Sequence, residues 1–137
     1  MNGWHGFSRR KALAEDTTNN TDAAFEAIKA FGLGLPEAVE EHPWGETALK
    51  VRRKSFVFLG HPKEGGISFS VKLPRSAEFA LLHPFAEKTG YGLGKANWIR
   101  CRFTDGDDIL LEMLFEWVAQ SYRAVAPKKL AALVPDA

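Results

Sequence analysis

The sequence predicts an α+β fold, a two-layer sandwich in which helices cover one face of a mainly antiparallel sheet. A length of 137 residues fits one domain, and a hydrophobic content of 45% with 10 Phe and 4 Trp suffices for one packed core. Hydrophobic residues have helical spacing near both ends of the chain and alternate with polar residues in between. The expected order of elements is α-β-β-β-α-(β)-β-α.

Residues 1–20 show no periodicity and are expected to form a disordered tail, whereas residues 21–137 form a single domain. Thr21 or Asp22 is expected to cap a helix that ends at Gly32 or Gly34. Pro36 then opens a short helical turn that runs to about residue 41.

Between residues 46 and 73 the hydrophobic period changes to two, which predicts three strands. Arg53-Lys54 is expected to connect the first two strands, and residues 63–66 the next two. Pro74 and Ser76 begin a second helical stretch that is interrupted at His83-Pro84 and closes at Gly90. A strand at 97–103, a strong helix at 107–123 and a short helix at 128–133 complete the fold.

Several functional classes have no support in the sequence. Cys101 is the only cysteine, so no intramolecular disulfide can form, and a reducing, cytoplasmic location is expected. Its inward position on a strand favours a buried thiol over a nucleophile. No apolar run approaches a membrane span, and no nucleotide-binding, hydrolase or zinc-protease motif occurs. We therefore expect a protein that is not an enzyme and binds no cofactor or metal.

The charge is unevenly distributed although the formal net charge is only +1. Residues 50–75 contain seven Lys or Arg and one acid, a balance of +6 in 26 residues. Acidic residues gather at 37–46 and at 105–116. Such separation predicts faces of opposite sign.

Strand alternation decides which side chains share the uncovered face of the sheet. With the hydrophobic positions pointing inward, the outward residues are two hydroxyls and the six predicted site residues Lys50, Arg52, Lys72, Trp98, Arg100 and Arg102. Five cations around a tryptophan, with no carboxylate, suit phosphate contacts and base stacking. DNA is therefore the expected partner. The alternative is a solvated face whose charges maintain solubility, with Arg side chains covering Trp98.

Two groups of motifs resemble the MmcQ/YjbR-like family. The first comprises Leu35-Pro36-Glu37-Ala38, Pro43-Trp44-Gly45, Lys50-Val51 and Phe56-Val57-Phe58, and the second comprises residues 92–99 and 121–130. The resemblance covers about residues 22–133 and implies a fold of the CyaY-like or secretion-chaperone type. It also implies a double-wing DNA-binding module without known catalytic residues, and it adds Lys128 to the predicted nucleic-acid-binding residues.

The implied fold keeps two other functions open. Because it also occurs in secretion chaperones, the chain could be a protein- or peptide-binding adaptor anchored by exposed Trp44, Phe56, Phe58 or Trp98. By analogy with the CyaY-like fold, the acidic helix could bind a metal, although a helix dipole explains the same acids.

Overall fold

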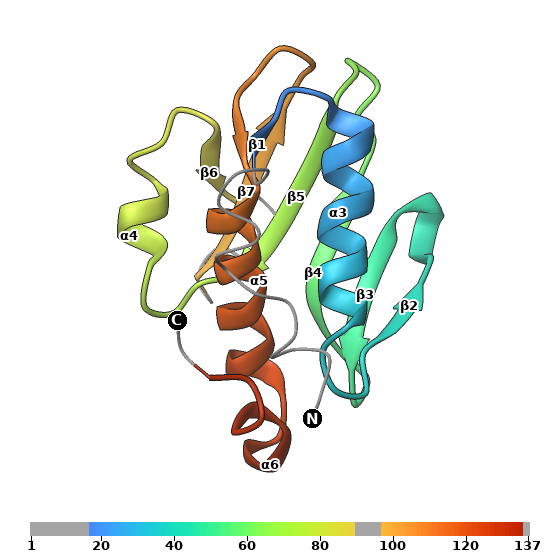
Figure 1. The fold of residues 1–137 in the computed structure, drawn as a ribbon, viewed down its shortest axis with the longest axis vertical. Coiled ribbons are helices and arrows are strands. Elements are labelled where there is room, and N and C mark those ends of the chain that lie inside the picture. The colour runs from blue at the N-terminus through green and yellow to red at the C-terminus, as the bar shows by residue number, and fades with distance from the viewer. Residues whose placement is uncertain (1–16, 90–96, 136–137) are drawn as a thin grey trace.

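The computed structural model describes residues 17–89 and 97–135 of the 137-residue chain. A large sheet and two long helices dominate the structure (Figure 1). In chain order the elements are β1 (Thr17–Thr18), α3 (Thr21–Leu33), β2 (Val39–Glu41), a 3-10 turn (Pro43–Gly45), β3 (Thr47–Val51), β4 (Lys54–Gly60), β5 (Ile67–Lys72), α4 (Ala77–Ala80), β6 (Ala86–Lys88), β7 (Trp98–Phe103), β8 (Ile109–Leu110), α5 (Leu111–Val125) and α6 (Lys128–Ala131).

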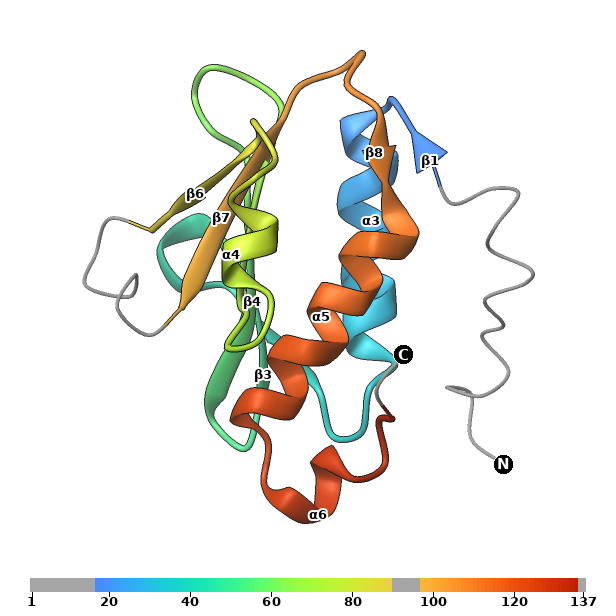
Figure 2. The same cartoon turned by 90° about the vertical axis from the view of Figure 1, so that its left-hand side faces the viewer.

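The large sheet has six strands in the order β2-β3-β4-β5-β7-β6, each antiparallel to its neighbours. Helices α3 and α5 contact each other and lie on the same side of this sheet (Figure 2). The opposite side of the six-stranded sheet is referred to below as the outer face. This arrangement confirms the predicted two-layer α+β fold with helices on one face.

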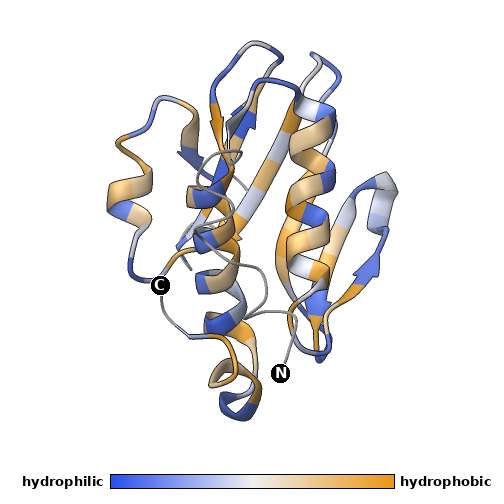
Figure 3. Cartoon of the chain, viewed as in Figure 1, coloured by the Kyte–Doolittle hydropathy of each residue, from blue (hydrophilic) through white to orange (hydrophobic). Residues whose placement is uncertain are grey.

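The core lies between the sheet and the two long helices. Strand residues at every second position are fully buried, for example Phe69 and Val71 on β5 and Cys101 on β7. Hydrophilic and hydrophobic residues alternate along α5, as expected for a helix with one buried side (Figure 3). Phe31 of α3 stacks on Phe115 of α5 with 4.6 Å between ring centroids, so the two helices also pack directly on each other.

Both long helices form where the hydrophobic spacing predicts them, but their first residues differ from the prediction. Asn20 is the N-cap of α3, and its side chain accepts a hydrogen bond from the Ala23 amide. The Asp105 carboxylate accepts two more, from the Thr21 amide at 2.8 Å and the Thr21 hydroxyl at 3.0 Å. These bonds lower the pKa of the Asp105 carboxyl, because they favour its charged form.

Several short segments depart from the expected secondary structure. Residues 39–41 form an edge strand instead of a helical turn, and residues 86–88 form the other edge strand, where a continuing helix was expected. Thr17 and Thr18, expected within the tail, pair with β8 in a separate two-stranded sheet. The remaining tail residues, 1–16, lie outside the described residues. Residues 107–110, expected to begin the late helix, instead form a turn and β8.

Candidate ligand-binding surfaces

The outer face carries five of the predicted site residues. Strands β5 and β7 pair Lys72 with Trp98, Ser70 with Arg100, and Ser68 with Arg102. The alternate residues on these strands belong to the core, so the paired residues must point away from the helices. Lys50 lies on the same face of β3, between the inward Leu49 and Val51. The period-two assignment is therefore confirmed for these five residues.

The prediction that this face lacks carboxylates is wrong. Glu87 of edge strand β6 lies opposite Arg100, and one of its oxygens is 2.8 Å from Nη2 of Arg100 and 3.6 Å from Nε of Arg102. Glu41 of edge strand β2 lies 2.9 Å from Nζ of Lys50. Each acid comes from a short edge strand, and each neutralises a neighbouring basic side chain.

The outer face consequently has little net charge. Its four cations are Lys50, Lys72, Arg100 and Arg102, and besides Glu41 and Glu87 two further carboxylates border it. Glu64 lies 3.5 Å from Arg102, and the Glu46 carboxylate lies over Gly60, where an added Cβ would be 3.2 Å from it. Four positive and four negative groups give a formal sum of zero.

Trp98 points outward as predicted but is not available for stacking. Only 6% of its surface is exposed. Its ring packs on the Phe58 ring of β4 with 5.4 Å between centroids. Phe58 is opposite Ser70 of β5, so it lies on the same face two strands away. The expectation that Trp98 is an exposed platform is therefore wrong, because a neighbouring aromatic residue covers it.

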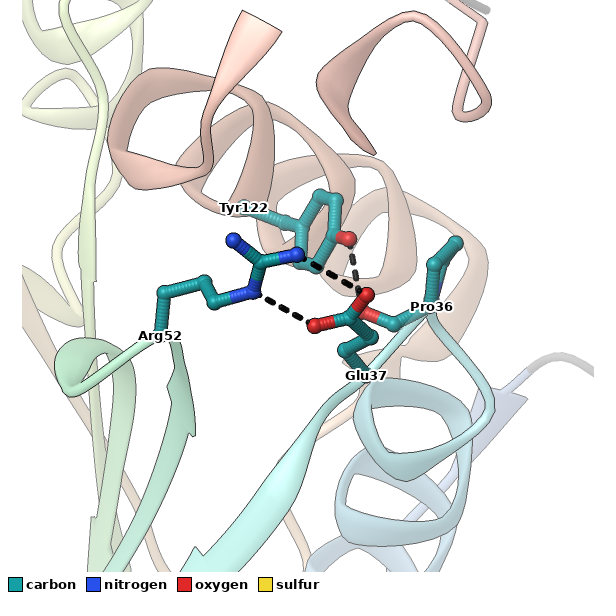
Figure 4. Close-up of polar contacts among 4 residues, drawn as sticks. All are labelled: Pro36, Glu37, Arg52 and Tyr122. Atoms are coloured by element: carbon teal, nitrogen blue, oxygen red, sulfur yellow. Dashed lines mark hydrogen bonds and ion pairs between the residues drawn. The ribbon is translucent and has the colours of Figure 1, made fainter. Parts of the chain in front are cut away.

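Arg52 does not lie on the outer face of β3. It occupies the two-residue β3–β4 turn with Arg53, and both have left-handed backbones, with φ of 50° and 73°. Its guanidinium makes a bidentate ion pair with Glu37, at 2.6 Å and 3.1 Å (Figure 4). This pairing lowers the pKa of Glu37 and raises that of Arg52. The expected Arg53-Lys54 connection is thus displaced by one residue.

Beside this ion pair, the Tyr122 hydroxyl of α5 donates a 2.7 Å hydrogen bond to the Pro36 carbonyl (Figure 4). Burial raises the pKa of Tyr122 to about 12, and the nearby Glu37 carboxylate contributes to the same shift. The contacts of Arg52 and Tyr122 together fix the segment after α3 against both the sheet and α5.

A second group of cations lies on the β3–β4 turn and α6, which are at one end of the molecule, and on the last residue of β5, which ends nearer to its middle (Figure 1). The first two parts each approach α5, because the Lys72 amide bonds to Ser121 and the Arg52 guanidinium lies near Tyr122, and α6 follows α5 in the chain. We define the basic end as the five residues Arg53, Lys54, Lys72, Lys128 and Lys129. Within residues 17–89 and 97–135, none of the five has an ion-pair partner within 4.0 Å.

Part of this group could have been recognised from the charge pattern of the sequence. Arg53 and Lys54 belong to the +6 stretch but were expected only to connect two strands. The β7–β8 turn at the opposite end of the long axis carries Asp105, Asp107 and Asp108 (Figure 1). The molecule is therefore electrostatically polar along its length.

The second notable feature of the outer face is a hollow beside Trp44, which is 100% exposed. Its volume is about 580 Å³. We call it the Trp44 hollow, and its lining residues are Trp44, Glu46, Phe58, Ser68, Ser70, Thr89 and Arg100. A neighbouring depression of about 300 Å³ shares Trp44, Glu46, Ser68 and Arg100 with it. The adaptor alternative expected an exposed anchor among four aromatic residues, and the structure exposes Trp44 fully, whereas Phe56 and Trp98 are buried.

The other candidate groups from the sequence, the cysteine and the acidic residues near the start of α5, have structural roles. Cys101 is buried, and desolvation raises the pKa of its thiol to about 12, so the thiolate nucleophile is strongly disfavoured at neutral pH. Asp107 accepts a hydrogen bond from the Thr104 amide in the turn before α5. Among the residues that the structure describes, no three His, Cys, Asp or Glu side chains are grouped as a metal site would require. The described helices include none long and apolar enough to cross a membrane.

Comparison with known proteins adds the family. No curated protein sequence matches the chain significantly. Among solved structures, the crystal structure of protein DR2400 from Deinococcus radiodurans, described as a DUF419 domain, has a TM-score of 0.61 at 22% identity. The match covers 82% of this chain and 89% of that one, and it supports the fold alone. A family model described as YjbR matches residues 33–124, more than half of the chain, and the protein therefore belongs to the YjbR family.

Proposed function

We propose that the protein is a non-enzymatic DNA-binding module that contacts the phosphate backbone through its basic end. One observation carries the proposal: the five cations of the β3–β4 turn, the start of β4, the end of β5 and α6 have no ion-pair partners among the described residues. Unpaired Lys and Arg side chains can neutralise phosphates and release counterions, which drives sequence-independent binding. We assign this function to the cytoplasm, the compartment expected for a chain with one free cysteine.

The predicted nucleic-acid-binding residues contribute unequally under this proposal. Lys72 and Lys128 belong to the basic end and carry the phosphate contacts together with Arg53, Lys54 and Lys129. Lys50, Arg52, Arg100 and Arg102 are each held by a carboxylate that DNA would have to displace. Trp98 takes no part, because its ring is buried.

Titration of duplex and single-stranded oligonucleotides at two salt concentrations tests the proposal. Replacing Lys54, Lys72 or Lys128 with Gln should each lower the slope of log K against log salt by about one. Lys63→Gln is the matched control, because Lys63 is an exposed lysine in the β4–β5 turn at the other end of the sheet. Absence of binding at low salt, or an equal loss in the Lys63 variant, would contradict the proposal.

A second candidate function, a protein-binding adaptor, is favoured by one feature that the basic end does not explain. Trp44 exposes its whole side chain beside a hollow of about 580 Å³. Exposed aromatic residues beside a concavity are typical anchors of protein interfaces. Because the Trp44 hollow and the basic end are different surfaces, one molecule can carry both functions.

A further inference from the structure

We propose that the Trp44 hollow binds an extended, uncharged protein segment by enclosing one large apolar side chain of that segment. This inference gives the adaptor function its site and its ligand chemistry, and it is independent of DNA binding at the basic end.

Trp44 is presented to solvent by an unusual backbone conformation. The residue has φ 56° and ψ 29°, within a 3-10 turn that is closed by a 3.0 Å bond from the Glu46 amide to the Pro43 carbonyl. Left-handed backbone is unfavourable for a residue with a bulky side chain. The chain thus holds a large apolar ring in solvent with a strained backbone, and such strain is concentrated at functional sites.

The hollow beside Trp44 has the size and the rigidity of a binding site. Its volume of about 580 Å³ lies within the range of ligand pockets, roughly 300–1,000 Å³. Phe58 lines it, and packing on buried Trp98 holds the Phe58 ring in place. Gly60 leaves room for the carboxylate of Glu46, which an added Cβ would approach to 3.2 Å. Aromatic surfaces of Trp44 and Phe58 are therefore available to an apolar side chain.

The polar groups around the hollow suit a peptide backbone. Ser68 and Ser70 on β5 supply hydroxyls, each of which can donate and accept hydrogen bonds. Thr89 after β6 also lines the hollow, but its hydroxyl is buried and is closed to a ligand. The backbone of a peptide provides N–H groups that can donate to the two serine hydroxyls and C=O groups that can accept from them.

The charge balance of the outer face favours an uncharged segment over a polyanion. Arg100, which lines the hollow, is paired with Glu87, and the Glu46 carboxylate lines the same hollow. A strand of DNA in the hollow would meet this carboxylate, and Arg100, the cation among the lining residues that the structure describes, is already paired with Glu87. Protein interfaces, in contrast, are enriched in Trp and Arg and poor in net charge at their centres.

Peptides of defined composition test the inference with the full-length, 15N-labelled protein. The probes are acetyl-Gly-Ser-Xaa-Ser-Gly-amide peptides in which Xaa is Trp, Leu, Ala or Glu. We expect the Trp and Leu peptides to shift the indole N–H of Trp44 and the amides of Ser68, Ser70 and Arg100. Their affinity should exceed that of the Ala and Glu peptides at least tenfold, the gain expected for burying one large apolar side chain.

Two variants separate the site from the rest of the surface. Trp44→Ala should weaken binding of the Trp peptide at least tenfold without changing the melting temperature, because the ring is fully exposed. Phe79→Ala is the matched control, since Phe79 is 72% exposed on α4 and does not line the hollow. The Phe79 variant should bind as the unmodified protein does.

Several results would overturn the inference. These are equal shifts for all four peptides, no shift at millimolar concentration, or shifts outside the hollow. A five-nucleotide deoxyadenosine oligomer that binds the hollow more tightly than the Trp peptide would assign it to nucleic acid instead. Shifts of the same residues that depend on protein concentration without peptide would assign it to a second copy of the chain. Loss of DNA binding in the Lys54 and Lys72 variants affects only the proposed DNA function, so the two failures are distinguishable.

Discussion

Ser121 of α5 bonds to Phe56 of β4 and to Lys72 of β5, at the place where the backbone ladder between these two strands ends. Its hydroxyl donates a 2.6 Å hydrogen bond to the Phe56 carbonyl and accepts a 2.8 Å bond from the Lys72 amide of β5. The last backbone pair between these strands is Val57 with Val71, so Phe56 and Lys72 lie one step beyond the ladder. One fully buried hydroxyl therefore serves both backbone groups and holds the helix against the sheet.

Ser121→Ala should destabilise the protein by about 2–3 kcal/mol, because a buried donor and a buried acceptor both lose their partner. Chemical denaturation of the variant and the unmodified protein measures the difference in unfolding free energy. Ser68→Ala is the control, since Ser68 is half-buried on the outer face and lies on the side of the sheet opposite to α5. A Ser121 variant within about 0.5 kcal/mol of the unmodified protein would show that the bridge is energetically unimportant.

The fold should lose stability in alkali, partly through Tyr122. Its pKa rises from about 10 to about 12 on folding, so folding favours the neutral hydroxyl that donates to Pro36. This contribution is fully present below pH 10 and is lost as the pH rises towards 12. Cys101, whose pKa is also raised to about 12, adds to the loss from about pH 9 upwards. Denaturation midpoints measured between pH 8 and pH 11 should therefore fall.

Tyr122→Phe separates the two contributions. The variant should lose about 1 kcal/mol at neutral pH, because the Pro36 carbonyl loses its donor. Its further decline between pH 10 and pH 11 should be smaller than that of the unmodified protein, because only Cys101 and the remaining titratable groups contribute. Parallel declines of the two proteins would contradict the role of the Tyr122 hydroxyl.

Trp98→Ala should affect stability rather than ligand binding. The ring is 6% exposed and packed on Phe58, so its removal leaves a cavity that costs about 3–5 kcal/mol. DNA affinity per folded molecule should be unchanged, since the indole is not accessible for stacking. Melting temperature and oligonucleotide titration of the same variant give both quantities. Weaker DNA binding with an unchanged melting temperature would mean that Trp98 stacks on bases after all.

Trp44→Gly should have the opposite effect and raise stability by about 1 kcal/mol. Glycine adopts the left-handed backbone of this position without the penalty paid by a side chain, and the exposed indole has no packing to lose. Thermal or chemical unfolding measures the gain. Trp44→Ala provides the comparison, because alanine keeps the backbone penalty. A destabilised glycine variant would show that the indole makes stabilising contacts, and it would contradict the inferred backbone strain at Trp44.

The parts of the fold that the sequence predicted are those with long, regular hydrophobic patterns. Strands β3, β5 and β7 follow a period of two, β4 is a short apolar run, and α3 and α5 follow helical spacing, so all six elements appear close to their expected positions. Edge strands β2 and β6 have three residues each, which is too short for any period to be recognised. Pro36 and Pro74 favoured helical turns in those regions, and tertiary pairing at the sheet edges overrode that preference.

The same short strands explain the errors at the candidate site. Alternation correctly placed Arg100 and Arg102 on the outer face, but their partner Glu87 comes from β6 and could not be placed without it. Trp98 is covered by Phe58 of β4, a contact that requires the strand order of the sheet. Periodicity determines which side a residue faces, whereas its neighbours depend on strand pairing. The sequence therefore predicted the direction of these side chains but not their neutralisation or burial.

Glu87→Gln tests whether the paired arginines of the outer face can also contact DNA. Glu87 lies 2.8 Å from Arg100 and 3.6 Å from Arg102, so its neutralisation removes the carboxylate that the two guanidinium groups share, while Glu64 remains 3.5 Å from Arg102. If DNA follows the outer face beyond the basic end, the variant should bind more tightly at low salt, with a salt slope steeper by about one. The ion pair is partly exposed, and its loss should change stability by less than about 1 kcal/mol. Glu78→Gln removes the same charge from an exposed position on α4 and controls for net charge. Equal effects of the two variants would confine the phosphate contacts to the basic end, because only the Glu87 variant removes a carboxylate from beside the outer-face arginines.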